Sequence, residues 1–146
     1  MKKLKIWTII LHSFIVIIHK STISVMFFIE FFIIQRWLAN NGDFSDSFTS
    51  LMLTASIISA LGKLLIITSF YVKKVVVKNL TGIIGLVLLY FSFRYVAYPS
   101  LPDTDFHKWA FWSGIPFIIA SILLFYQQFT VLKNKFSKKK SEVTDV

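Results

Sequence analysis

The chain has 146 residues, of which 55% are apolar and only 16% are charged, and its mean hydropathy is +0.69. Soluble domains average roughly 45–50% apolar and about 25% charged residues. A single domain of this size has too much surface to hide so many apolar side chains from water, so the composition favours a membrane protein over a soluble one. The chain has no cysteine, which excludes disulfides, thiolate metal sites, iron–sulfur clusters and dithiol redox chemistry.

Four long apolar stretches predict four transmembrane helices. They run over residues 6–38, 48–72, 80–98 and 109–132, and each exceeds the ~18 residues that indicate a membrane span. Because backbone groups in lipid must bond within their own segment, we expect these stretches to be helical. The predicted fold is an all-α, antiparallel four-helix bundle in one integral membrane domain, residues 1–132, followed by a flexible basic cytoplasmic tail, residues 133–146.

The first stretch, residues 6–38, is longer than one span requires. As a continuous helix it would reach about 50 Å, against a hydrocarbon core of about 30 Å. Two possibilities stay open: residues 4–18 continue the first helix, or they lie at the membrane interface. The apolar run is too long for the core of a cleaved signal peptide, so we expect it to be retained.

Lysines mark one side of the predicted membrane domain. They occur at the N-terminus, in the connection after the second stretch and in the tail: Lys2, Lys3, Lys5, Lys73, Lys74, Lys78, Lys133, Lys135, Lys138, Lys139 and Lys140. The positive-inside rule therefore places both termini in the cytoplasm, with the protein in the cell (inner) membrane. These lysines set the orientation in the membrane and can contact anionic lipid at the cytoplasmic face. Because this explains the basic charge, we expect no nucleic-acid partner.

Ionisable side chains inside the predicted spans are the first candidates for a site, because charged residues in membranes are rare and face the interior of the bundle. On a continuous first helix one face would carry four polar residues: Thr8, His12, His19 and Glu30. Lys63, which shares a face with Ser56 and Ser59, and Arg94 in the third stretch are the competing partners for Glu30. The polar face is either a path for protons or cations, or a helix-contact surface whose polar groups bond to neighbouring helices.

The connection before the fourth stretch is a weaker candidate, for a metal site. Asp103, Asp105 and His107 alternate there, and an extended loop would point them to one side as ligands of a divalent cation. A helix cap in a solvated loop explains the same residues more simply. We expect no cofactor; haem in particular would need histidines that face each other, whereas His12 and His19 lie on one predicted helix.

No phosphate-binding loop, dinucleotide fingerprint or nucleophile motif is present, and the serines lack an acid–histidine context, so we do not expect an enzyme. The expected function is that of a small non-enzymatic integral membrane protein that acts through self-assembly or as an accessory subunit of a membrane complex. The alternative is a small proton- or ion-coupled transporter, or an oligomeric channel, that uses the intramembrane His/Glu/Lys site. An intramembrane enzyme ranks third.

Overall fold

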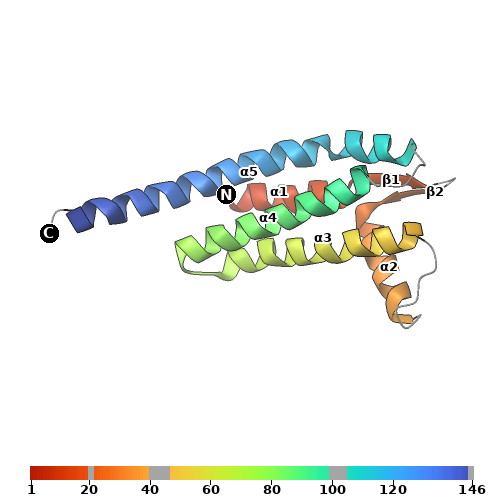
Figure 1. Cartoon of the computed structure of the whole chain (residues 1–146), viewed down its shortest axis with the longest axis horizontal. Coiled ribbons are helices and arrows are strands. Elements are labelled where there is room, and N and C mark those ends of the chain that lie inside the picture. Colours follow the sequence, from red (N-terminus) through yellow and green to blue (C-terminus); the bar gives the residue numbers. More distant parts are fainter. Residues whose placement is uncertain (20–21, 40–46, 99–104, 145–146) are drawn as a thin grey trace.

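The computed structural model describes residues 1–19, 22–39, 47–98 and 105–144. Within these residues it contains five helices and one two-stranded antiparallel sheet. In chain order the elements are α1 (Lys2–Ser13), β1 (Val16–His19), β2 (Thr22–Val25), α2 (Met26–Ala39), α3 (Ser47–Tyr71), α4 (Val75–Ala97) and α5 (Asp105–Thr144). Helices α1, α3, α4 and α5 run along the long axis of the molecule, and α2 stands across that axis near one end (Figure 1).

Three of these helices are long and apolar enough to cross a membrane. The candidate spans are Ser50–Tyr71, Val75–Ala97 and Lys108–Lys135. Large apolar side chains are exposed on every helix, whereas many buried side chains are polar: Lys5, Thr8, His12, Glu30, Ser56, Ser59, Ser69, Asn79, Ser92, Ser121 and Gln128. An apolar exterior around buried polar groups is the distribution expected in a membrane, because lipid tails cannot form hydrogen bonds with polar groups. The three helices and this distribution indicate a membrane protein.

Helices α3 and α4 approach most closely at two glycines. A Cβ on Gly85 would lie 2.7 Å from the carbonyl oxygen of Gly62, and a Cβ on Gly62 would lie 2.9 Å from the carbonyl oxygen of Gly85. Neither position has room for a side chain, because the opposing atoms belong to backbone. Further along the pair, Ser92 Oγ donates to the carbonyl of Ala55 at 2.8 Å. Small residues allow such backbone contact where apolar burial does not drive helices together.

The segment predicted as one helix over residues 6–38 is two helices separated by a β hairpin, so this prediction is wrong. Helix α1 ends at Ser13, and β1 then pairs with β2, with Val16 opposite Val25 and His19 opposite Thr22. The reason lies in residues 15–18, which are four consecutive β-branched residues. Such side chains restrict χ1 in a helix and pack well on extended backbone.

Strand β1 of the hairpin packs against the helices. The backbone N–H of Val16 donates to Ser113 Oγ of α5 at 2.9 Å, and the N–H of Met26 donates to the carbonyl of Ile15 at 2.9 Å. Ile15 and Ile17 are each only 1% exposed. Non-helical backbone at membrane depth is tolerated where it is buried in protein. Ile17 of β1 meets that condition, whereas Ile23 of β2 is 71% exposed.

Helix α1 and strand β1 together have the length of one membrane span. A 12-residue helix and a 4-residue strand reach roughly 31 Å, close to the ~30 Å hydrocarbon core. They lie beside α5 (Figure 1). Residues 4–18 thus do not continue one long helix, since α1 ends at Ser13 and the chain turns into strand β1.

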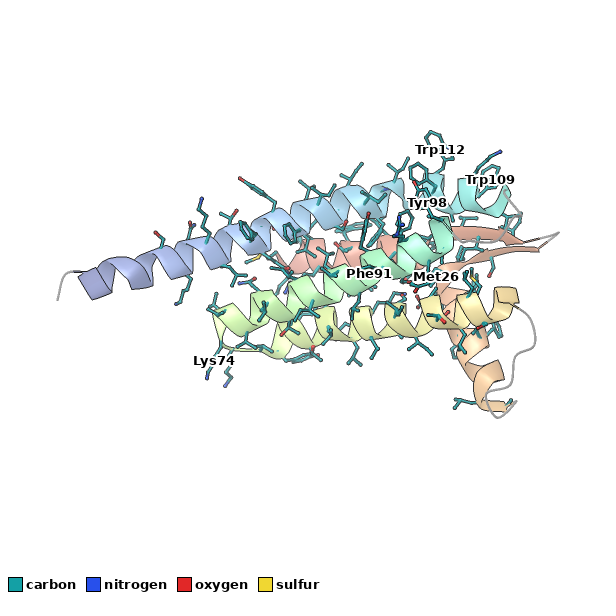
Figure 2. The ribbon with its side chains drawn as sticks, in the orientation of Figure 1. Met26, Lys74, Phe91, Tyr98, Trp109 and Trp112 are labelled. Carbon is teal, nitrogen blue, oxygen red and sulfur yellow. The ribbon has the colours of Figure 1, made fainter. Side chains whose placement is uncertain are left out.

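The two ends of the bundle differ in composition. Lys74, at the connection between α3 and α4, lies at one end, which we call the lysine end (Figure 2). Tyr98, Trp109 and Trp112 gather at the opposite end, together with the β hairpin, and we call this the tryptophan end (Figures 1 and 2). Helix α5 extends past the other helices at the lysine end and continues to Thr144, so the tail expected to be flexible from residue 133 is helical up to that residue.

Candidate functional site

An ion pair between Glu30 of α2 and Lys63 of α3 is the centre of the candidate site. Lys63 Nζ lies 2.6 Å from Glu30 Oε2 and 2.9 Å from Glu30 Oε1, so the ammonium bonds to both carboxylate oxygens. The two side chains are only 12% and 11% exposed. Of the two expected partners of Glu30, Lys63 is the one that the structure pairs with it. The competing Arg94 is exposed near the end of α4, with its guanidinium over the ring of Tyr98.

Ser59 links this ion pair to His12. Its hydroxyl donates to Glu30 Oε1, and its Oγ lies 3.3 Å from His12 Nδ1. Ser59 precedes Lys63 by four residues, so both side chains leave the same face of α3. His12 Nδ1 is itself 4.0 Å from Glu30 Oε1. Four side chains from α1, α2 and α3 therefore form one connected polar cluster, which we call the His12–Lys63 cluster.

The hydrogen bonds of the cluster have a defined direction. Ser59 has one hydroxyl proton, and it donates that proton to Glu30. The Ser59 oxygen must therefore accept from His12, so in this arrangement Nδ1 of the imidazole carries the proton. The hydrogen-bond chain runs from His12 Nδ1–H to Ser59 Oγ and from Ser59 O–H to the Glu30 carboxylate. Lys63 stabilises that carboxylate.

The other ring nitrogen of His12 faces a different environment. Nε2 is buried and has no hydrogen-bond partner among the described residues. The ring packs edge-on against Phe117 of α5, with centroids 4.9 Å apart. With Nδ1 protonated, Nε2 holds a free lone pair. The imidazole can thus accept a proton on one side and release one to Ser59 on the other.

Helix α1 turns its polar side inward along its whole length. Its buried residues are Lys5, Thr8 and His12, whereas Ile6, Trp7, Ile10 and Phe14 are exposed. Thr8 Oγ1 donates to the carbonyl of Leu4 at 2.8 Å. The spacing of three and four residues places all three polar groups on one face of α1, which points into the bundle.

The remaining predicted site residues are not part of the cluster as the structure describes it. The helical face proposed for Thr8, His12, His19 and Glu30 does not exist as one face, because residue 19 ends strand β1. The side chain of His19 lies outside the described residues, as do Asp103 and the side chains of Asp105 and His107, so the metal expectation falls there too. Among the groups that the structure does describe, no set of three His, Asp or Glu side chains could hold a metal ion.

The role of Ser59 as the bridge between His12 and Glu30 was not predicted from the sequence. Its place on the same helical face as Lys63 was the available signal. The serines were expected to lack an acid–histidine context, and the structure corrects this for Ser59. The chain matches no protein-family model, and comparisons with curated proteins and with solved structures gave no match. A function for the chain must therefore be inferred from the chemistry of the cluster.

Proposed function

We propose that this chain is a small, non-enzymatic, multi-pass protein of the cell (inner) membrane that moves protons through its interior, with His12, Ser59 and Glu30 as the relay. The observation that carries the proposal is the directed hydrogen-bond chain from His12 through Ser59 to Glu30. Ionisable groups buried at membrane depth are rare, and they are functional-site candidates because proton and ion pathways use them.

The relay step consists of proton transfers alone. A proton that binds Nε2 of His12 makes the imidazole cationic, and the Nδ1 proton can then pass to Ser59 Oγ. The hydroxyl proton of Ser59 passes at the same time to the Glu30 carboxylate. Each bond to hydrogen that breaks is replaced by one that forms, and the net result is a neutral Glu30 and a neutral His12 in the other tautomer. The loss of charge on Glu30 weakens its ion pair with Lys63.

A proton relay explains the direction of the Ser59 hydroxyl better than hydrolysis does. A serine nucleophile donates its hydroxyl proton to the histidine that activates it. Here Ser59 donates to Glu30 instead. Ser59 is also 0% exposed. A hydroxyl that donates to a carboxylate inside the bundle is suited to passing a proton, not to attacking a substrate.

Proton flux into vesicles tests this proposal. The purified protein is reconstituted into vesicles with a trapped pH dye, and a pH gradient is applied in the presence of valinomycin and potassium. We expect the wild type to dissipate the gradient faster than empty vesicles, and His12→Gln to reduce that flux by about 10²-fold, because glutamine cannot be protonated. Ser59→Ala is expected to have a similar effect.

Ser56→Ala is the matched control. Ser56 lies on α3 close to Ser59, is 0% exposed, and its hydroxyl has no hydrogen-bond partner among the described residues. Its removal should leave the flux unchanged. A wild-type flux equal to that of empty vesicles, or equal flux for the wild type and His12→Gln, contradicts the proposal.

Helix α2 supports a second candidate, the assembly role expected from the sequence. Apart from the turns that contact α3, it exposes a row of large apolar side chains: Phe27, Phe28, Phe31, Phe32 and Leu38. The helix stands across the bundle (Figure 1), and the exposure of these side chains shows that this face is directed to the surroundings of the molecule. A neighbouring membrane helix, in a second copy or another protein, would cover it.

A further inference from the structure

Lys5 of α1 is a buried cation without a carboxylate partner among the described residues. It is 1% exposed. Its ammonium donates to Ser69 Oγ of α3 at 2.6 Å and lies 5.6 Å from the centre of the Phe70 ring. An ammonium has three protons to donate, and a neutral hydroxyl and an aromatic ring do not balance its charge.

The register of α3 and α4 places further polar groups at the same level. Gly62 of α3 and Gly85 of α4 contact each other, and the two helices are antiparallel. A residue seven positions after Gly62 therefore lies opposite one seven positions before Gly85, which pairs Ser69 with Lys78. Lys78 acts electrostatically on Lys5, which agrees with this register. The two cations repel each other, and an anion bound between them would turn that repulsion into attraction.

Two buried amides, Asn79 of α4 and Gln128 of α5, lie on or against the turn of α4 that follows Lys78. Asn79 follows Lys78, is 1% exposed, and its Oδ1 has no hydrogen-bond partner in the described part of the chain. Gln128 of α5 packs on Gly82, one turn further along α4, and is 0% exposed. Neither Gln128 Nε2 nor Oε1 has a hydrogen-bond partner there either. Asn79 Nδ2 does donate, to the carbonyl of Val75 at 2.9 Å, so Gln128 is the amide whose two polar atoms both lack a described partner. Such an amide indicates a missing ligand or water, because buried polar groups are nearly always bonded in native proteins.

Among the side chains that the structure describes, no carboxylate pairs with Lys5 or Lys78. Residues 1–29, 47–98 and 106–141 contain no aspartate or glutamate. Glu30 bonds to Lys63. Glu142 follows Gln128 by 14 residues, which is about 21 Å along α5. The negative charge that balances Lys5 and Lys78 must therefore come from outside these segments.

We propose that Lys5, Lys78 and Gln128 form a binding site for the phosphate group of a ligand that enters from the lysine end. Phosphate oxygens accept hydrogen bonds from the ammonium of Lys5 and from Gln128 Nε2, and water held by the phosphate donates to Oδ1 of Asn79. This site lies on the other half of α1 from His12 and does not depend on the proton relay.

The depth of Lys5 fits a membrane source for that phosphate. Its partner Ser69 is two residues from Tyr71, where the candidate span of α3 ends. The ammonium therefore lies close to the membrane surface, where lipid phosphates lie, and basic pockets between helices at this level bind anionic headgroups. A small soluble phosphate would reach the same groups from the water beyond the lysine end.

Ligand-dependent stabilisation of the full-length protein tests the site. The midpoint of thermal unfolding is measured in a neutral detergent with increasing inorganic phosphate, and in nanodiscs of phosphatidylcholine with or without phosphatidylglycerol. A ligand that binds the folded state raises the midpoint as its concentration rises. A rise with inorganic phosphate identifies a small phosphate as sufficient, and a rise only with phosphatidylglycerol identifies the lipid headgroup; both support the site.

Lys5→Met is expected to weaken the apparent affinity at least about 10-fold, because a hydrogen bond to a charged group contributes ~1.5–3 kcal/mol. Lys3→Met, an exposed lysine of the same helix, is the matched control for the loss of one charge and should keep the response. Gln128→Leu tests the site independently of whether Lys5→Met folds, and should also weaken binding. No midpoint shift of the wild type with either probe, or an equal loss in Lys3→Met, overturns the proposal.

Discussion

Glu30 and Lys63 are the pair whose removal has the clearest expected effect on stability. Each side chain is nearly nine-tenths buried, so a single substitution strands the other charge. We expect Glu30→Gln and Lys63→Met each to lower the free energy of unfolding by roughly 3–5 kcal/mol. The double variant should recover much of that loss, since it leaves no unpaired charge. Unfolding in lipid–detergent mixtures measures all three values.

Arg94→Met is the control for this cycle. Arg94 is exposed, and its described contact is with the ring of Tyr98, so we expect a change within about 1 kcal/mol. If the losses of Glu30→Gln and Lys63→Met simply add in the double variant, the two residues do not stabilise each other.

The sequence predicted this pair because an ionised group in a membrane requires a partner, and only two cations were within reach of Glu30. It could not predict that Ser59 bridges to His12. That contact depends on where α1 lies against α3, and the position of α1 follows from the break after Ser13. A contact between side chains 47 residues apart is set by packing and not by local spacing.

At the scale of elements, hydropathy located the α3, α4 and α5 spans within a few residues but joined α1, β1, β2 and α2 into one helix. The reason is physical. An apolar run shows only that a segment is buried away from water. A helix in lipid and a strand buried in protein are both buried in this way, so hydropathy alone does not distinguish them. The β-branched run at residues 15–18 was the local signal for the strand. The prediction followed instead the general rule that segments in lipid are helical.

Helix α2 carries a prediction about assembly. Phe28 and Phe32 are stacked, with centroids 6.3 Å apart, and are 51% and 60% exposed. If a neighbouring helix covers this face, the wild type is larger than its 16.9 kDa monomer in native membrane mimetics. The double variant Phe28→Ala, Phe32→Ala should shift the particle to the monomer, because aromatic side chains contribute most to such contacts.

Ile119 and Ile122 of α5 provide the control for that experiment, since they are 56% and 62% exposed on another helix. Their replacement by alanine should leave the particle size unchanged. A wild type that is monomeric in lipid, measured by mass photometry or light scattering, shows that α2 contacts lipid alone.

At the scale of the whole molecule, the two ends of the bundle differ in charged and aromatic residues. The lysine end combines the α3–α4 connection with the long C-terminal part of α5, and the tryptophan end carries Tyr98, Trp109 and Trp112 (Figure 2). These three aromatic side chains are 60%, 58% and 68% exposed, as expected for residues at a membrane–water interface. From the positive-inside rule we expect the lysine end to face the cytoplasm.

Cysteine labelling in intact cells tests that orientation, and the absence of native cysteine makes each introduced thiol the sole target in the chain. Ser47→Cys, at the start of α3, should react with an impermeant maleimide from outside. Lys73→Cys and Ser137→Cys, which belong to the lysine end, should react only after the membrane is permeabilised, because moving many lysines across the membrane during insertion is unfavourable. Reaction of Ser137→Cys in intact cells would reverse the assignment and would place the proposed phosphate site at the outer surface.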